Sequence, residues 1–346
     1  MSENFDYELA MKSRPHVVIL GAGASCAAIP NGDKNGHYIS AMKGFVEKLG
    51  LANLIEEIDL TTDSDNLEDI YMEIDERSQT EMKCYDAKVK LQDAIRDYMA
   101  TYELPDEPTV YDYLVLSMTS KDLIATFNWD PMLMQAYERA HRITNNLPQL
   151  AFLHGNVAIG FCEEHDVIGW NGFNCRCGKP LTSVDLLYPI KEKEYTSNAF
   201  IEKEWGRLQH YMKHAYMVTV FGYSAPKSDV AAIELMKQAW GDVNSRNLEE
   251  IEIVDLCNED EVLESWNKFI HTHHYAYHND FLETTLGKCP RRSCEATFDR
   301  LMNVRWLSSN GFKKSMTFAD IIDLLSPLLN DERMNEGKML NNPYLA

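Results

Sequence analysis

The sequence contains no long hydrophobic run, no internal repeat and no low-complexity segment. Its longest apolar stretches, such as Val17 to Gly23, are far too short to cross a bilayer. The N-terminus, MSENFDYELAMKSRP, is acidic and lacks the apolar core of a secretion signal. At 346 residues the chain is long enough for a well-buried core, so we expect a globular protein of the cytoplasm.

Basic side chains are scarce. The chain has 33 Lys plus Arg against 54 Asp plus Glu, which gives a formal net charge of −21. A surface this acidic repels nucleic-acid backbones and anionic membranes. We therefore expect neither nucleic acid nor a membrane as a partner.

The glycine-rich turn after the first expected strand lacks the third glycine of the dinucleotide motif G-x-G-x-x-G. Here His16 to Leu20 is followed by Gly21-Ala22-Gly23-Ala24-Ser25-Cys26. The acidic residue expected about twenty positions further on is not clearly placed either, so a dehydrogenase is the least favoured function for this chain. Such a turn brings backbone N–H groups close to a pyrophosphate, or it is a tight turn without a ligand. The turn alone supports both interpretations equally.

Short apolar runs alternate with helical patterns along the chain, which predicts an α/β fold with a Rossmann-like, mainly parallel sheet and flanking helices. Further strands are expected at Asp122 to Phe127, Leu150 to Leu153, Tyr216 to Phe221 and Glu250 to Leu256. Helices are expected at Tyr38 to Leu49, Asn66 to Ile74, Lys83 to Tyr102, Thr109 to Met118, Met132 to His141, Asp260 to Phe269 and Thr317 to Leu329.

Each expected strand leads into a loop with polar or small residues, and the carboxyl ends of parallel strands meet at one edge of a sheet. Asn128 offers both a donor and an acceptor, and His154 is suited to proton transfer near neutrality. Asp130 precedes Pro131, so it also fits a helix cap, and His154 also fits a structural histidine. The loops after the last two strands contribute Gly222, Ser224 and Asp255.

Cysteine is unevenly distributed, and one cluster has metal-ligand spacing. Cys162 and His165 are followed by Cys175 and Cys177, which suits a tetrahedral structural zinc site. The one-residue spacing of the second pair is unusual, and unconnected reduced cysteines are the alternative. The segment HTHHYAYH, from His271 to His278, fits an edge strand or loop better than a second metal site.

The ordered set Gly-Ala-Gly-Ala-Ser, Thr-x-Asn-x-Asp, His-Gly and Gly-x-Ser, each after a strand, resembles the sirtuin superfamily over roughly residues 16 to 270. The resemblance implies NAD as ligand and a zinc module just after the histidine strand. It also implies Asn128 and His154 as catalytic residues. The residues implied to bind NAD are Gly21, Ala22, Gly23, Ser25, Asp130, Gly222, Ser224 and Asp255.

The sequence departs from the protein-deacylating sirtuins after the first motif. Where those enzymes have Gly-Ile-Pro-Asp-Phe-Arg, this chain reads Ala28-Ile29-Pro30-Asn31-Gly32-Asp33. This form is more similar to sirtuin-like proteins of bacterial anti-phage systems, which cleave NAD to nicotinamide and ADP-ribose. The resemblance thus implies an NAD hydrolase acting in defence, as a homo-oligomer or with a partner defence protein. An NAD-dependent protein deacylase and a non-catalytic NAD or ADP-ribose sensor are the alternatives.

The expected organisation is a sirtuin-like NAD-binding domain at 1–270 and a mainly helical C-terminal extension at 271–346. Within the domain, we expect a helical insert at about 36–120 and the zinc module at about 160–182.

Overall fold

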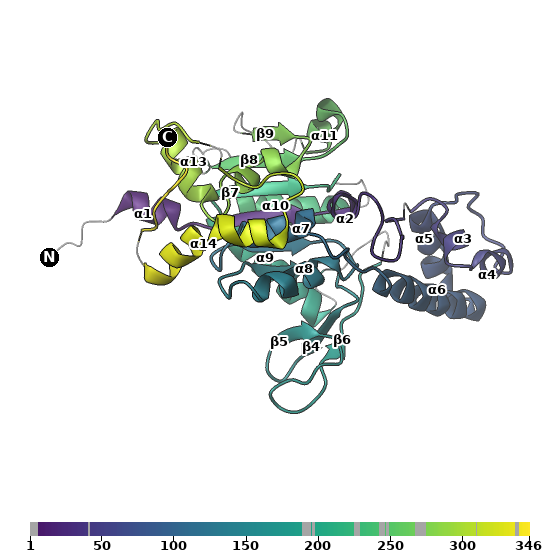
Figure 1. Cartoon of the computed structure of the whole chain (residues 1–346). Helices are drawn as coiled ribbons and strands as arrows, with labels where there is room; N and C mark the ends of the chain where they lie inside the picture. Colours follow the sequence, from purple (N-terminus) through teal and green to yellow (C-terminus); the bar gives the residue numbers. More distant parts are fainter. Residues whose placement is uncertain are drawn as a thin grey trace.

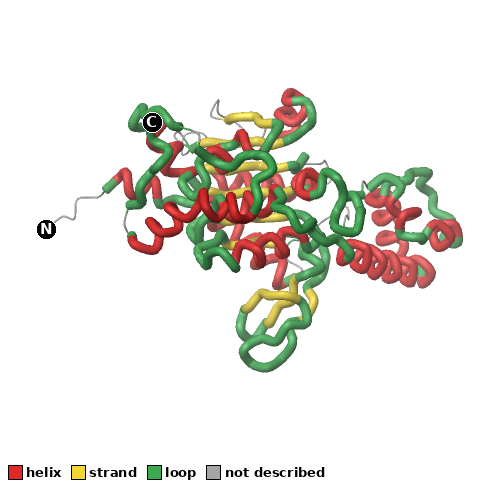
Figure 2. Tube along the Cα trace, in the orientation of Figure 1, coloured by secondary structure: helices red, strands yellow, loops and turns green. Residues whose placement is uncertain are grey.

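A six-stranded sheet forms the centre of the protein (Figures 1 and 2). The computed structural model describes residues 6–40, 42–188, 195, 198–224, 229–241, 246, 249–266, 275–308, 310–335 and 339–346. The strand order is β3-β2-β1-β7-β8-β9, and every neighbouring pair is parallel. The strands are β1 (His16–Leu20), β2 (Leu123–Thr126), β3 (Gln149–Phe152), β7 (Met217–Phe221), β8 (Glu250–Val254) and β9 (Tyr275–His278).

The sequence expectation of a Rossmann-like parallel sheet is confirmed, with five of its strands close to the expected bounds. The sixth, β9, is an edge strand that pairs with β8 and contains the second half of HTHHYAYH. The first half of that segment, 271–274, lies outside the described residues.

The chain runs outward from β1 to β3 and then returns to place β7 on the other side of β1. Right-handed crossovers put helices of the two halves on opposite faces of such a sheet. The helices α7 (Val110–Leu116) and α8 (Met132–His141) pack together on one face, and α9 (Ala199–His214) and α10 (Val230–Trp240) pack together on the other. The remaining helices of the sheet domain are α1 (Tyr7–Lys12), α2 (Ala22–Ala28) and α11 (Glu259–Trp266).

The part of the chain that connects β1 to β2 forms a helical lobe, which projects from one side of the sheet (Figure 1). It consists of α3 (Phe45–Lys48), α4 (Ala52–Glu56), α5 (Leu67–Ser78) and α6 (Met82–Ala100). The buried face of α6 carries Cys84, Ala87, Leu91 and Ile95 at helical spacing and packs against α5. Asn66 caps α5 by accepting a hydrogen bond from the Glu68 N–H.

The helix expected at Tyr38 to Leu49 is wrong in its first half. Among the described residues of this stretch, only Phe45–Lys48 is helical. Gly44 adopts a left-handed conformation with φ of 69°, and Lys43 forms a bridge with Asn66 instead of continuing a helix. The hydrophobic period therefore predicted a helix through Gly44, whereas the helix begins only after this residue, at Phe45.

A small antiparallel sheet lies apart from the main one, below it in Figure 2. Its strands are β4 (Ile159–Cys162), β5 (Val167–Trp170) and β6 (Thr182–Ser183), in the order β5-β4-β6. The inward-facing Cys162, Cys175 and Leu181 form its own small buried cluster.

The chain after β9 returns to the face of the sheet that carries α7. It forms η3 (Phe281–Glu283), α12 (Thr285–Lys288), α13 (Ser293–Leu301) and α14 (Phe318–Met334). The segment 271–346 thus contributes a strand to the main sheet before its helices begin.

A buried polar chain joins these C-terminal helices to the sheet. The imidazole of His16 on β1 contacts Ser293 Oγ at 2.9 Å through Nδ1 and Thr219 Oγ1 at 2.8 Å through Nε2. Glu252 on β8 accepts hydrogen bonds from both the N–H and the hydroxyl of Thr285, at 2.9 and 2.7 Å. Complete burial lowers the pKa of His16 to about 4, so this histidine is neutral in the folded protein.

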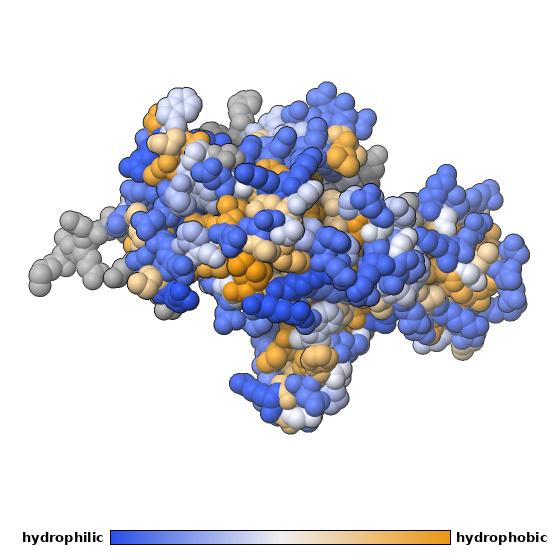
Figure 3. All heavy atoms as spheres, in the orientation of Figure 1, coloured by the Kyte–Doolittle hydropathy of each residue, from blue (hydrophilic) through white to orange (hydrophobic). Residues whose placement is uncertain are grey.

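The face seen in Figure 3 is mostly hydrophilic, with apolar patches at its centre near α14, over the small sheet and on the helical lobe. Among the described residues, no helix combines the length and apolar character that spanning a membrane requires.

Candidate functional site

The strand order places a topological switch point between β1 and β7, where the chain direction across the sheet reverses. In open parallel sheets, ligands bind outside the carboxyl ends of the strands at this point. The loops after β1, β2, β3 and β7 are joined here by contacts between their own residues. The expected convergence is thus met for these four loops, but no described contact brings the side chain of Asp255, after β8, to Asn128 or His154.

The turn after β1 packs directly on the turn after β7. Gly21 N–H donates to Phe221 O at 3.0 Å, and Gly23 N–H donates to Gly222 O at 2.9 Å. A Cβ on Gly222 would lie 2.3 Å from the backbone nitrogen of Ala24, and its φ of 61° is left-handed. Only glycine fits this contact. A third N–H of the turn, that of Ala24, donates to Gly21 O at 3.0 Å. Ala22 and Gly23 are exposed.

The carboxamide of Asn128 joins the loop after β2 to the turn after β1. Its Nδ2 donates to Gly21 O at 2.8 Å, to Ser25 Oγ at 2.9 Å and to Tyr111 Oη at 3.2 Å. A carbonyl oxygen only accepts, so Nδ2 and not Oδ1 must face Gly21. Asn128 is half-buried, and its Oδ1 is turned away from these groups.

Ser25 and Asp130 lie beneath the turn rather than on its surface. Ser25 is 1% exposed, and its hydroxyl donates to Asp130 Oδ2 at 2.7 Å. The other carboxylate oxygen of Asp130 accepts from Met132 N–H at 3.1 Å at the start of α8. Burial raises the pKa of the Asp130 carboxyl, and the hydrogen bonds from Ser25 and Met132 oppose that shift. Asp130 therefore anchors both the Ser25 hydroxyl and the N–H of Met132 at the start of α8.

His154 lies in the loop after β3 and is 6% exposed. The loop is held by α9, where Trp205 Nε1 donates to Leu153 O at 3.1 Å. Gly155 has a φ of 73°, and a Cβ there would lie 2.2 Å from the carbonyl oxygen of Asp185. This residue turns the chain directly after the histidine, so the backbone fixes the position of His154.

Aromatic rings fill the space between the loops. The Phe127 ring lies 4.3 Å from that of Tyr223 in a stacked arrangement and meets the His154 ring edge-on at 4.8 Å. Trp266 Nε1 donates to Tyr223 O at 3.2 Å. The loops after β2, β3 and β7 therefore share one apolar centre around Phe127.

The last two expected ligand residues lie further out. Ser224 is exposed, next to the buried Tyr223. Asp255 accepts a hydrogen bond from Cys257 N–H at 2.9 Å and so stabilises the turn after β8. No contact described in the structure brings either side chain to Asn128 or His154.

Cys162, His165, Cys175 and Cys177 come together in the small sheet and could hold a zinc ion. Their ligand atoms all lie within 4.8 Å of one another. The distances from His165 Nδ1 to the sulfurs of Cys162 and Cys175 are 3.7 and 3.6 Å, and the sulfurs of Cys162 and Cys177 are 4.0 Å apart. Tetrahedral zinc, with bonds of ~2.3 Å to sulfur and ~2.1 Å to nitrogen, places its ligands roughly 3.6–3.8 Å apart. Four protein ligands leave no open position, as expected for a structural ion.

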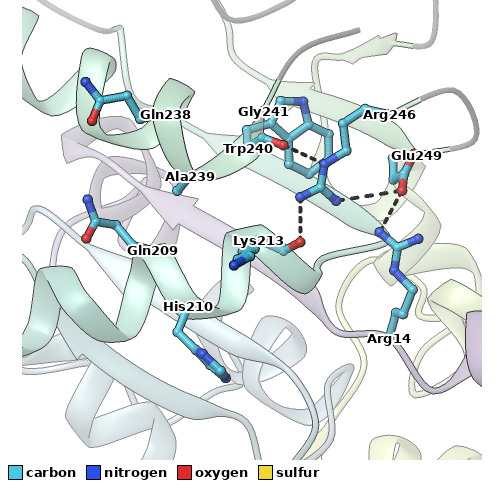
Figure 4. A pocket seen from close by; sticks show the side chains of 10 residues that line it. All are labelled: Arg14, Gln209, His210, Lys213, Gln238, Ala239, Trp240, Gly241, Arg246 and Glu249. Atoms are coloured by element: carbon cyan, nitrogen blue, oxygen red, sulfur yellow. Dashed lines mark hydrogen bonds and ion pairs between the residues drawn. The ribbon is translucent and has the colours of Figure 1, made fainter. Parts of the chain in front are cut away.

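A cavity of about 740 Å³ lies at the opposite edge of the sheet from these loops (Figure 4). It is lined by basic groups, but its two arginines are already engaged. The Arg246 guanidinium donates to four backbone carbonyl oxygens, including that of Trp240 at 2.5 Å. Arg14 donates to Glu249 at 2.6 Å and to Ala215 O at 2.5 Å. These arginines satisfy carbonyls at the carboxyl ends of helices, which is a structural role.

Sequence reasoning missed three residues of the strand-end region: Tyr111, Asn156 and Tyr223. Asn156 Nδ2 donates to Asn128 O at 3.2 Å and to Asp130 O at 2.5 Å, and its place beside His154-Gly155 was the available signal. Tyr223 lies within the Gly-x-Ser motif. Tyr111 comes from α7, ahead of β2, where the sequence pattern gives no sign of contact with the loops.

No protein-family model and no curated protein matches the sequence. Among solved structures, the chain is similar to a Sir2 homologue in complex with NAD, at 13% identity over 86% of this chain and 96% of that chain, with a TM-score of 0.40. It is also similar to a structure on the basis of sirtuin substrate affinity, at 14% identity over 87% and 100% of the two chains, with a TM-score of 0.42. A third, Sir2 bound to an acetylated peptide, has 12% identity over 86% and 96%, with a TM-score of 0.38. Similarities this low assign neither residues nor activity to this chain.

Proposed function

We propose that this protein is an NAD hydrolase, which cleaves NAD to nicotinamide and ADP-ribose at the carboxyl edge of the parallel sheet. The observation that carries the proposal is the fixed carboxamide of Asn128, held against Gly21 at the switch point with the His154 loop packed on the same aromatic centre. The motif resemblance to the sirtuin superfamily supports NAD as the ligand.

In the proposed reaction, the bond between the ribose C1′ and the nicotinamide nitrogen breaks, and the nitrogen keeps the electron pair. Positive charge then develops on the ribose, and a water oxygen forms the new bond to C1′. One proton is released, so that NAD⁺ and water give nicotinamide, ADP-ribose and H⁺. Holding the water and the ribose in place can contribute several kcal/mol to the lowering of the barrier.

Asn128 and His154 have separate roles in this proposal. Asn128 Oδ1 accepts a hydrogen bond from the attacking water or from a ribose hydroxyl. His154 accepts a proton from the ribose hydroxyl or from the water. The exposed Ala22 and Gly23 meet the pyrophosphate, with Gly222 and Ser224 on the other side of the switch point. Asp255 is proposed to meet the adenosine ribose.

Ser25 and Asp130 support the site from below. Because the Ser25 hydroxyl is buried and bonded to Asp130, we propose that both act on NAD through Asn128 and the turn rather than by direct contact.

The test is incubation of the purified protein with NAD, with and without an acetylated peptide, while nicotinamide is quantified. A hydrolase releases nicotinamide at the same rate in both mixtures. Release that requires the peptide would identify a deacylase, and tight NAD binding without release would identify a sensor.

The biological role proposed with this activity is defence against phage, by depletion of NAD in the infected cell. It rests on the resemblance to sirtuin-like anti-phage proteins. Bacteria that express the protein should lose NAD on infection, whereas bacteria that express His154→Ala should keep it. A homo-oligomer, or a complex with a partner defence protein, is proposed on the same resemblance.

A further inference from the structure

The hydroxyl of Tyr111 lies at the centre of the hydrogen-bond network beneath the first turn. It is 2.8 Å from Ser25 Oγ and 3.2 Å from Asn128 Nδ2. Tyr111 is 1% exposed and belongs to α7, on the face of the sheet opposite α9 and α10. Tyr111 thus comes from a helix outside the strand-end loops, and its hydroxyl contacts both Ser25 and Asn128.

The direction of each hydrogen bond follows from the number of protons available. Ser25 has one hydroxyl proton, which it gives to Asp130 Oδ2 at 2.7 Å. Ser25 Oγ therefore accepts from Tyr111, and the Tyr111 hydroxyl must be the donor in that pair. Burial, helped by the nearby Asp130, keeps the pKa of Tyr111 well above its usual value, so the phenol retains this proton.

The same count of donor protons determines the orientation of the Asn128 carboxamide. Its two Nδ2 protons are shared among three acceptors, which are Gly21 O, Ser25 Oγ and Tyr111 Oη. A carboxamide rotated by half a turn would direct Oδ1 at the carbonyl oxygen of Gly21, where no proton is available. Among the described residues, none donates a hydrogen bond to Oδ1. The free group of Asn128 is thus an acceptor.

We infer that Tyr111 is a positioning residue for Asn128, whose Oδ1 it holds ready for a hydrogen-bond donor of the substrate. A ribose hydroxyl or a water molecule has this chemistry, whereas a phosphate or a carboxylate oxygen does not. The inference rests on the proposed function for its consequence in turnover, but not for the orientation of Asn128.

The orientation can be tested in the protein without NAD. In asparagine-selective ¹⁵N-labelled protein, the side-chain amide signals of Asn128 are identified by their absence in Asn128→Ala. Tyr111→Phe should shift these signals and speed their hydrogen exchange by about tenfold, because one partner of Nδ2 and the donor to Ser25 are lost. Unchanged signals in Tyr111→Phe would overturn the inference.

Tyr113→Phe is the matched control. It removes a hydroxyl from the same helix, but one that faces Lys313 O and Met316 O at 3.5 and 3.4 Å, outside the network. It should leave the Asn128 signals unchanged. Shifts of equal size in both variants would point to a general effect on α7 and would also overturn the inference.

The second measurement is nicotinamide release from NAD. Tyr111→Phe should lower kcat about 3- to 10-fold and leave KM within about twofold, since one hydrogen bond that orients a reacting group is lost. Shifted Asn128 signals with an unchanged kcat would contradict the role in turnover. If the wild-type protein releases no nicotinamide, the proposed function fails, and the amide signals still decide the orientation of Asn128.

Discussion

The side-chain nitrogen of Asn128 donates a hydrogen bond to the carbonyl oxygen of Gly21 at 2.8 Å, across a sequence separation of 107 residues. This contact joins the ends of two neighbouring parallel strands, β1 and β2, next to the switch point between β1 and β7. Because Gly21 O can only accept, the contact also decides which end of the carboxamide is left for a ligand.

Asn128→Asp should damage both the fold and the site. The aspartate keeps an acceptor but places a carboxylate against Gly21 O and near the buried Asp130. We expect the free energy of unfolding to fall by about 1–3 kcal/mol, measured by urea denaturation. Asn145→Asp, at an exposed position, should leave it nearly unchanged. Equal stability of both variants would contradict the contact between Asn128 and Gly21.

Gly222→Ala should destabilise the protein by roughly 2 kcal/mol or more, because the added Cβ meets the turn after β1 at a left-handed φ. Gly172→Ala separates the two causes. Gly172 also has a left-handed φ, of 79°, but an added Cβ meets no atom within 4 Å. Gly172→Ala should therefore lower the free energy of unfolding by only about 1 kcal/mol. Thermal melting by circular dichroism compares them, and equal losses would mean that the two turns are not in contact.

Purified protein should contain one zinc ion per chain, by elemental analysis. Cys175→Ser should weaken zinc binding by more than about 100-fold, because even the outer-shell partners of a metal contribute 10–100-fold. Cys257→Ser, at an exposed cysteine outside the cluster, is the control and should retain the metal.

Removal of zinc by a chelator should speed hydrogen exchange in the small sheet of β4, β5 and β6 and leave the parallel sheet protected, because the two sheets are separate. A small sheet that stays fully protected without metal would argue against a structural ion.

Because of His16, the free energy of unfolding should decrease as the pH is lowered from about 6.5 to about 4. Its pKa is lowered from 6.5 to about 4 by burial, so in this window the unfolded chain binds a proton that the folded protein does not. Stability therefore rises with pH across the window and is lost as pH falls, by up to about 3 kcal/mol from this group.

His16→Gln should reduce the difference in unfolding free energy between about pH 7 and pH 4 by that amount, measured by urea denaturation. His141→Gln, at an exposed helix end, should keep the wild-type pH dependence. An unchanged dependence in His16→Gln would show that His16 is not buried neutral.

The sequence predicted most of the fold because its signals were local. The apolar run of β1 and its glycine turn are read from neighbouring residues, and α8 has the bounds expected from its hydrophobic period. The late start of the helix at Phe45 was missed because it depends on the pairing of Lys43 with Asn66, more than twenty residues away.

The candidate site was predictable where a residue follows a strand, as Asn128 and His154 do. It was not predictable where a partner arrives from elsewhere in the chain. Tyr111 reaches Ser25 from a helix 86 residues further along, and no periodicity records that contact. Likewise, the resemblance implied that Ser25 binds NAD, and sequence alone does not show that its hydroxyl is buried and donates to Asp130.

The central claim is cleavage of NAD at His154 and Asn128, and the most direct test is simultaneous measurement of NAD, nicotinamide and ADP-ribose in purified wild-type protein, His154→Ala and the control His141→Ala. We predict equimolar nicotinamide and ADP-ribose from the wild type and the control, and a rate at least about 100-fold lower for His154→Ala. Intact NAD with the wild-type protein, or cleavage by His154→Ala at the wild-type rate, would contradict the claim.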